Sequence, residues 1–427
     1  MKTVSLALAL AVLVVPHLQA QEVPAVPPAS AAEKPAEKPA EKKSPPVSAG
    51  PEGFSLQNES GDFRVQIRGY THFDGRFFPG DDGGLATDAF LLRRVRPIVQ
   101  GSLGKYFEFN FTPDFGGGVA VVQDAWFDFK PSPKLRVRVG KFKSPVGLER
   151  LQSSPALHFV ERAFPTAIVP NRDVGIQLHG ELAGGVVAYQ AAVVDGATDG
   201  ASVDTDVNDG KDVAGRLILS PFKRGSSALR ELGFGISGTQ GQQAGALPAY
   251  RSPGQISVVT AAAGVTADGT RKRYSPQLLF YAGPFGLLAE YARSESEVKK
   301  ADGSHATFEA KAWQATATVA LTGDKAAYAG VRPRKLFDPA KGQWGALELV
   351  ARVDGLEVSP ASVNAGLIDA TRSVRKIRAW AAGLNWSLTR NVKQVVNFEH
   401  ASFTGGATDG RDRESENVVF IRTQFSF

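Results

Sequence analysis

Basic side chains gather in one long connection of the sequence, between Gly140 and Asp173. They are Lys141, Lys143, Arg150, Arg162 and Arg172, and they outnumber the acids Glu149, Glu161 and Asp173. Rings of Lys and Arg at the narrowest part of a water-filled channel favour anions. The connection also carries apolar residues that need a surface to pack on, namely Leu148, Leu151, Leu157, Phe159, Phe164, Ile168 and Val169. Folding into a barrel lumen would bury them and narrow the pore, so the sequence predicts an anion-selective constriction here.

Arginine also recurs at alternate positions of extended segments elsewhere in the chain. Alternation assigns the following to the lumen side: Arg64, Arg68, Arg94, Arg96, Arg136, Arg138, Arg271 and Arg273. An Arg that faces lipid near the bilayer midplane costs about 2–4 kcal/mol, which favours the inward assignment. We expect Arg94, Arg96, Arg136 and Arg138 to line the anion pathway. Lumen arginines can also serve solvation alone, so a binding role for any one of them stays a hypothesis.

Composition narrows the chemistry further. The formal charge of +6 is only mildly basic, and Lys and Arg are scattered through alternating segments. Nucleic-acid binding would normally show a clustered basic face, so we expect no nucleic-acid partner. The chain has no Cys, which excludes disulfides, thiol catalysis and thiolate metal sites.

Motifs for catalysis, metals and cofactors are weak. The segment Gly233 to Gly238 matches G-x-G-x-x-G, but it lies within strand patterning and opens no helix, which a dinucleotide site needs. The histidines are scattered without the spacing of metal ligands. We therefore expect no catalytic residues, no metal and no cofactor. An outer-membrane hydrolase remains an alternative, because spacing cannot exclude a nucleophile with His and a carboxylate. A weakly selective or plugged structural barrel is another.

Period-2 alternation dominates the chain from Phe54 onward, in segments of about nine to eleven residues, the length at which a tilted strand spans a bilayer. These segments begin near Phe63, Phe90, Tyr106, Val122, Leu135, Val174, Val186, Asp212, Glu231, Arg271, Phe285, Glu309, Gly345, Arg375, Asn391 and Glu414. The even number returns the last strand to the side where the first began. The sequence thus predicts an all-β fold, a transmembrane antiparallel up-and-down β-barrel of about 16 strands.

Connection lengths give an independent test of the barrel. The odd connections are mostly long and the even ones mostly tight, as expected for long external loops and short periplasmic turns. A soluble β-sandwich has no reason to sort its loops this way. The main exception is Thr322 to Trp344, an even connection of unusual length.

The two ends of the chain favour export to the outer membrane of a Gram-negative bacterium. Residues 1–20 combine Lys2, an apolar run and a small residue at Ala20, the pattern of a signal peptide. Residues 21–52 are rich in Pro, Ala, Lys and Glu and read as an extended periplasmic linker. The barrel domain is predicted over residues 53–427. Its last strand alternates apolar and polar residues up to Phe427, with Val419, Ile421, Thr423 and Phe425 assigned to lipid and Arg422 to the lumen.

Several motifs, in the same order, resemble the phosphate-selective porins of the O and P family. They are Lys141 to Glu149, Phe159 to Arg162, Pro170 to Gly180, Ser275 to Gln277, Gly283 to Tyr291, Gly345 to Arg352 and Gly383 to Trp386. The resemblance runs from about Phe54 to Phe427. It implies a sixteen-stranded homotrimer in outer-membrane lipid that passes small anions such as phosphate. It also implies a C-terminal Phe427 read by the barrel assembly machinery.

The resemblance adds two expectations about the lumen. Family members have a periplasmic turn that enters the lumen, and Thr322 to Trp344 corresponds to it. The best-known members also line the fifth external loop with a ladder of Arg. Here the corresponding stretch, Tyr250 to Ile256, holds only Arg251. Anion preference survives this departure better than a tight phosphate site does.

Overall fold

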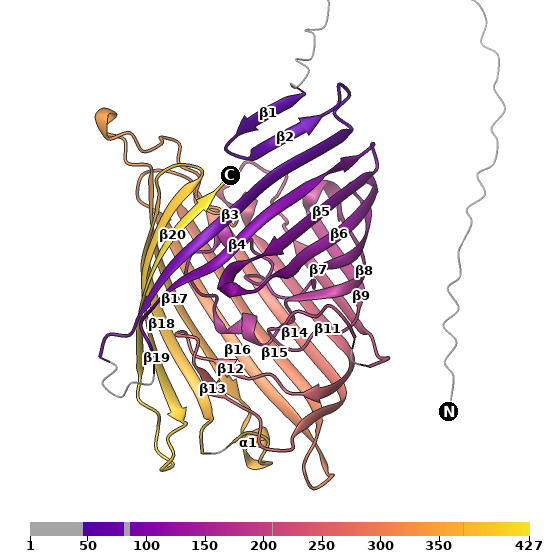
Figure 1. The fold of residues 1–427 in the computed structure, drawn as a ribbon, viewed down its shortest axis with the longest axis vertical. Helices are drawn as coiled ribbons and strands as arrows, with labels where there is room; N and C mark the ends of the chain where they lie inside the picture. The colour runs from indigo at the N-terminus through magenta and orange to yellow at the C-terminus, as the bar shows by residue number, and fades with distance from the viewer. Residues whose placement is uncertain (1–45, 81–85, 207, 370) are drawn as a thin grey trace, which may run out of the picture. The chain divides into compact units, whose positions relative to one another are not determined.

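The computed structural model of the chain describes residues 46–80, 86–206, 208–369 and 371–427. The predicted signal segment and most of the predicted linker lie outside the described residues. Within them, one antiparallel sheet of 18 strands forms, and its strands β3–β11 and β14–β20 make a closed barrel wall (Figure 1). The predicted sixteen-stranded all-β barrel is confirmed.

The wall strands follow one another in chain order, each paired with its sequence neighbours. Their bounds are β3 Phe63–Phe77, β4 Ala89–Leu103, β5 Phe107–Asp114, β6 Val121–Ser132, β7 Leu135–Lys143, β8 Arg172–Leu182, β9 Val187–Val194, β10 Asp212–Leu219, β11 Gly233–Ala246, β14 Thr266–Ala282, β15 Phe285–Lys299, β16 His305–Ala320, β17 Ala346–Val358, β18 Val374–Ser387, β19 Val392–Gly405 and β20 Glu416–Ser426. β14 and β16 begin several residues before the predicted Arg271 and Glu309. The first residues of β14 include Asp268 and Gly269 and do not alternate regularly, whereas β16 already alternates at Ala306 and Phe308.

Closure is made by β20 against β3, from Val419 opposite Phe77 to Ser426 opposite Tyr70. It leaves no unpaired edge within the membrane, where an unsatisfied backbone group is costly. Ile421, Thr423 and Phe425 are exposed on the outside, as predicted. Inside, Arg422 is buried and makes a bidentate ion pair with Asp74 of β3, at 2.7 and 2.6 Å. The seam of the barrel is therefore fastened on its lumen side by a charged pair.

A hairpin precedes the wall at the end that carries the C-terminus (Figure 1). It consists of β1 (Val47–Gly50), which lies within the range predicted as linker, and β2 (Gly53–Gln57). β2 pairs with β3 beyond the point where β20 stops, with Phe54 opposite Ile67. Gly53 has φ +92°, and a Cβ there would lie 2.3 Å from the carbonyl oxygen of Ile67, so the turn requires glycine.

The remaining elements are short and lie in the connections. β12 (Tyr250–Arg251) and β13 (Ser257–Val259) form a small hairpin between β11 and β14. Helical turns are α1 Pro360–Asn364, η1 Gly116–Gly118, η2 Ser154–Ala156, η3 Phe164–Ala167, η4 Ala183–Gly185, η5 Ala228–Glu231 and η6 Pro339–Lys341. Across the residues described, no helix is both long enough and apolar enough to cross a membrane.

Candidate permeation pathway

The connection between β7 and β8 folds into the barrel, as its apolar content predicts. We call residues 144–171 the in-folded loop; its magenta trace lies inside the wall in Figure 1. Val146, Leu148 and Ile168 are fully buried, and Phe159 is 2% exposed. Burial of these side chains is the main driving force for the loop's position. The lumen is therefore narrowed by a packed segment.

Polar groups of the wall fix this loop at several points. Glu290 of β15 accepts hydrogen bonds from the backbone N–H groups of Leu148 and Glu149, at 2.7 and 3.2 Å. Asp354 of β17 accepts one from the N–H of Phe164 at 3.3 Å. These buried N–H groups have no sheet partner, so the wall carboxylates supply the acceptors that they need.

The long periplasmic connection between β16 and β17 meets the loop from the other side. The Tyr328 hydroxyl donates to the carbonyl oxygen of Leu148 at 2.5 Å, and Gln152 Nε2 donates to the carbonyl oxygen of Tyr328 at 2.8 Å. Burial raises the pKa of Tyr328, which keeps its hydroxyl a donor. The expectation that this connection enters the lumen is confirmed, and it explains the exception in connection length.

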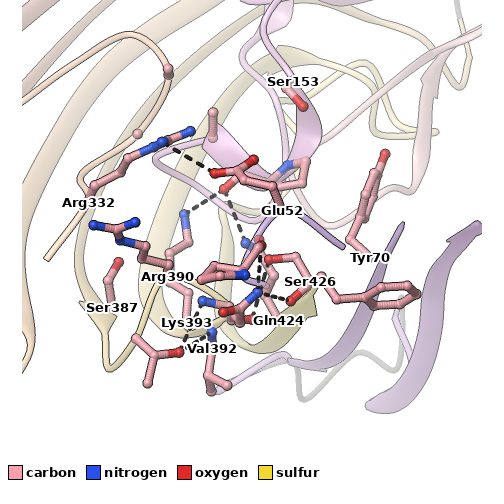
Figure 2. A pocket seen from close by; sticks show the side chains of 18 of the residues that line it. Glu52, Tyr70, Ser153, Arg332, Ser387, Arg390, Val392, Lys393, Gln424 and Ser426 are labelled. Carbon is pink, nitrogen blue, oxygen red and sulfur yellow. Dashed lines mark hydrogen bonds and ion pairs between the residues drawn. The ribbon is translucent and has the colours of Figure 1, made fainter. Parts of the chain in front are cut away.

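Three cavities follow one another along the lumen. The outer cavity, of about 670 Å³, is lined by external connections and shares Arg96, Ser154 and Arg172 with the next. The middle cavity measures about 430 Å³. The exit cavity, of about 410 Å³, opens between the N-terminal hairpin and the periplasmic turns, and shares residues such as Arg68 and Tyr328 with the middle one (Figure 2). Shared linings make the three a continuous candidate pathway.

The middle part of the pathway lies along one half of the barrel, whereas the outer and exit cavities also take lining residues from β17–β20. Every strand from β3 to β10 contributes to the middle cavity, through Arg68, Tyr70, Arg96, Ile98, Asn110, Thr112, Asp124, Trp126, Arg138, Lys143, Arg172, Gln190 and Arg216. The other lining residues come from the in-folded loop and from Tyr328. We call β3–β10 the open half of the wall. Strands β11 and β14–β20, whose side chains hold the loop, are the covered half.

Arginines of the open half are mostly paired. Arg96 binds Asp114 at 2.7 Å and Arg138 binds Asp128 at 2.7 Å, while Arg172 binds Asp124 at 3.1 Å. Arg136, which lines none of the three cavities, contacts both Glu108 and Asp128. Such pairs fix the side chains but cancel much of their field.

Cations at the base of the in-folded loop are different. Lys143 donates to the carbonyl oxygens of Leu151 and Gln152, Arg150 to that of Thr166, and Arg162 to those of Glu149 and Gln152. In the described part of the chain none of the three cations forms an ion pair. Burial, together with the charges of Arg162 and Arg172, lowers the pKa of Arg150. An anion among these groups would relieve their mutual repulsion.

The other predicted site residues are dispersed. Arg94 lines the outer cavity and lies 3.2 Å from His72 Nδ1, and exposed Arg251 lines the same cavity. Lys141 lines none of the three cavities. Its position in β7 shares a face with Val137 and Val139, and it pairs with Asp204 of the β9–β10 connection at 2.5 Å.

Sequence reasoning missed several pathway cations, among them Arg93 and Arg216. Arg93 sits at a register shift between β3 and β4, where His72 pairs with Arg94 and Phe73 with Leu92. The shift lets Arg93 turn inward and bind Glu161 of the in-folded loop at 3.0 Å. Burial opposes ionisation of Glu161, but Arg93 and Arg94 outweigh it and lower the pKa of Glu161 to about 2. Arg216 of β10 lines the middle cavity and bonds Gln277 at 3.1 Å; alternation within β10 was the available signal.

Solved structures with a similar fold are outer-membrane channels. The channel DcaP of Acinetobacter baumannii superposes with a TM-score of 0.56 at 11% identity, covering 87% of this chain and 99% of that one. OmpT of Vibrio cholerae gives 0.55 at 10%, covering 87% and 100%. An anion-selective porin from Comamonas acidovorans gives 0.53 at 11%, covering 85% and 99%. At such identities the likeness concerns the fold.

Sequence comparison places the chain more closely. No curated protein sequence matches it significantly. The family model for phosphate-selective porin O and P matches residues 64–427, which is the whole barrel wall apart from its first residue. With the barrel and the in-folded loop, that match shows that the chain is an outer-membrane channel and belongs to the phosphate-selective porin O and P family.

Proposed function

We propose that this protein lets small anions diffuse passively across the outer membrane, with phosphate or a related oxyanion as the main cargo. The observation that carries the proposal is the lining of the middle cavity. Six cationic side chains line it, namely Arg68, Arg96, Arg138, Lys143, Arg172 and Arg216. Three of them, Arg96, Arg138 and Arg172, are paired with carboxylates, and the other three form no ion pair among the described residues. A cleft lined by one sign of charge raises the local concentration of the opposite ion.

Transport through such a lining needs binding that is weak and repeated. Paired arginines such as Arg138 hold their geometry, while Lys143, Arg150 and Arg162 supply net positive charge beside the narrowest segment. An anion would exchange part of its hydration shell for these donors and move between them. Flux then follows the concentration gradient, because several weak sites permit release where one tight site would trap the ion.

Phosphate as the cargo rests on two supports of unequal strength. Guanidinium groups bind phosphate oxygens in a planar, bidentate geometry, and arginines dominate the pathway. The family description also names phosphate. Against a tight site stands Arg251, the single basic residue in the stretch 250–256. We therefore propose preference for oxyanions over cations, with selectivity for phosphate over chloride as the narrower claim.

The alternatives predict different behaviour. In our proposal no chemistry is performed, and no cofactor or metal takes part; among the described residues no group of His, Asp and Glu could hold a metal ion. A plugged structural barrel would conduct no ions, and a hydrolase would consume a substrate.

A planar-bilayer recording tests the proposal. The reversal potential under a KCl gradient should have the sign of an anion-selective pore. Phosphate titrated against chloride should then reduce the chloride current in a saturable way. A closed channel, or a reversal potential of the cation-selective sign, would contradict the proposal. Anion selectivity with no saturable effect of phosphate would leave a general anion pore.

Targeting and assembly are part of the same proposal. Residues 1–20 would direct export, residues 21–52 would supply a periplasmic linker, and Phe427 would be read by the barrel assembly machinery. We propose a homotrimer whose apolar outer faces contact lipid and neighbouring copies. Crosslinking of the full chain in membranes would show a trimer band, and its absence would reject that state.

A further inference from the structure

The exit cavity carries a group of cations, one of which also lines the middle cavity. Arg68, Arg332, Arg390 and Lys393 line it, together with the acids Glu52 and Glu348 (Figure 2). Lys393 Nζ donates to the carbonyl oxygens of Pro155 and Leu157, at 3.2 and 2.9 Å, which leaves one of its three donors free. Within the described residues, Arg68 and Arg390 have neither an ion pair nor a side-chain hydrogen bond.

The two acids of this cavity differ in how they are engaged. Glu348 is buried, accepts a hydrogen bond from Asn385 at 2.9 Å and lies 3.5 Å from His158 Nδ1. Glu52 is exposed, and its carboxylate lies 3.4 Å from Arg332, a contact drawn as a dashed line in Figure 2. Side-chain exposures of 57% for Glu52 and 68% for Arg332 make this pair a weak one, worth about 0–1 kcal/mol.

The backbone of the β1–β2 turn holds Glu52 at this mouth. Asn391 Nδ2 donates to the carbonyl oxygen of Pro51 at 2.9 Å, and Gln66 Nε2 donates to that of Glu52 at 2.7 Å. Position 53 in this turn accepts only glycine, which makes the turn tight. The position of the carboxylate is therefore built into the hairpin, whereas its ion pair with Arg332 is easily exchanged.

We propose that the exit cavity is a second oxyanion site and that Glu52 competes with the passing anion for its cations. The carboxylate pairs with one member of the cation group, Arg332, and an entering phosphate displaces it from that arginine. The hairpin thereby limits how tightly the pore holds anions on the periplasmic side and favours their release. This inference rests on the proposed anion transport and assigns Glu52 a role in setting affinity.

Side-specific block of chloride current tests the competition. The full-length chain is inserted into planar bilayers from one chamber, and inorganic phosphate is added to one chamber at a time. Glu52→Gln should lower the half-blocking phosphate concentration from one side only, by about two- to fivefold, the equivalent of up to 1 kcal/mol. Arg390→Gln should raise the half-blocking concentration from that same side.

Asp338→Asn is the matched control. It removes a carboxylate that pairs with Lys341 in the β16–β17 connection, which also carries Arg332, but this carboxylate does not line the exit cavity. The half-blocking phosphate concentrations from the two chambers should therefore stay unchanged. An equal shift from both sides in Glu52→Gln, no shift at all, or the same shift in the control would overturn the competition. If the wild-type reversal potential showed no anion preference, the proposed function and this inference would both fail. Preserved anion preference with an unresponsive Glu52 variant would reject the competition alone.

Discussion

On the covered half of the wall, inward carboxylates bind the backbone of the in-folded loop; Glu290 and Asp354 accept its N–H groups. On the open half, inward carboxylates such as Asp114 and Asp124 bind arginines of the wall itself. The two halves thus carry the same residue types with different partners. On the covered half some acids position a segment, while Glu399 pairs with the buried Arg352. On the open half the acids neutralise cations beside water.

This difference locates the net charge of the pathway. Most wall arginines of the open half are neutralised where they stand, so they contribute shape and hydrogen-bond donors. The loop brings Arg150 and Arg162 against that half, beside Lys143 at the end of β7, and all three have only backbone carbonyls as partners. The field that an anion meets therefore depends on a segment that the covered half holds in place.

The largest expected effect comes from loosening the loop on the covered half. Glu290→Ala removes the acceptor of two buried N–H groups, and each unsatisfied group costs about 1–3 kcal/mol. We expect higher single-channel conductance, more open-channel noise and a weaker anion preference. Glu297→Ala changes the same residue type on β15, but its carboxylate accepts from Thr270 in an exposed position and should leave conductance unchanged. Equal conductance in both variants would show that Glu290 does not hold the constriction.

The next effect tests the cations of the loop base. Lys143→Glu reverses a charge in the middle cavity, and a unit charge about 4 Å from a passing ion acts with about 1 kcal/mol even in water. The substitution changes the charge by two units and acts oppositely on anions and cations, so the anion-to-cation permeability ratio should fall by at least about tenfold. The measurement is a shift of the reversal potential towards the cation side.

Lys141→Glu is the control for that substitution, two residues away in the same strand. Lys141 pairs with Asp204, whose side chain is 68% exposed, and it lines none of the three cavities. Reversing the charge at position 141 should therefore change the reversal potential little. If both variants shifted the reversal potential equally, selectivity would be set by the total charge of the region and would not depend on the position of Lys143 in the cavity lining.

A smaller effect concerns pH. The pKa of Glu161 is lowered from about 4.5 to about 2 by Arg93 and Arg94 against the opposing effect of burial. A lowered carboxyl pKa contributes stability that is complete above the unfolded value and is lost as pH falls from about 4.5 through 2. Glu161 should therefore stay ionised between pH 5 and 8, so Glu161→Gln should shift the reversal potential by the same amount at every pH in this range in chloride solutions. A shift that changed with pH near 6 would contradict a permanently ionised Glu161.

Much of the wall could be predicted from the sequence, because strand alternation and loop length are local signals. The loop's apolar side chains also predicted its inward fold. Two features of the pathway could not be predicted from the sequence. The register shift at Arg93 reverses alternation at a single residue, and nothing in the local pattern marks it. The residue types alone also do not indicate that Arg138 is neutralised by Asp128 while Arg162 contacts only carbonyl oxygens. These partners are set by the tertiary fold.

The smallest expected effect is at the external rim. Arg251 lies on the exposed edge of the outer cavity, in a connection with no other cation between residues 250 and 256. A single exposed charge is screened over about 8–10 Å at physiological ionic strength. Arg251→Ala should therefore change the half-blocking phosphate concentration by less than about twofold, while Arg162→Gln, at the buried loop base, should raise it more. A large loss of phosphate block in Arg251→Ala would mean that anions are captured at the rim before they reach the loop, and the open half would then share the selecting role with an external connection of the covered half.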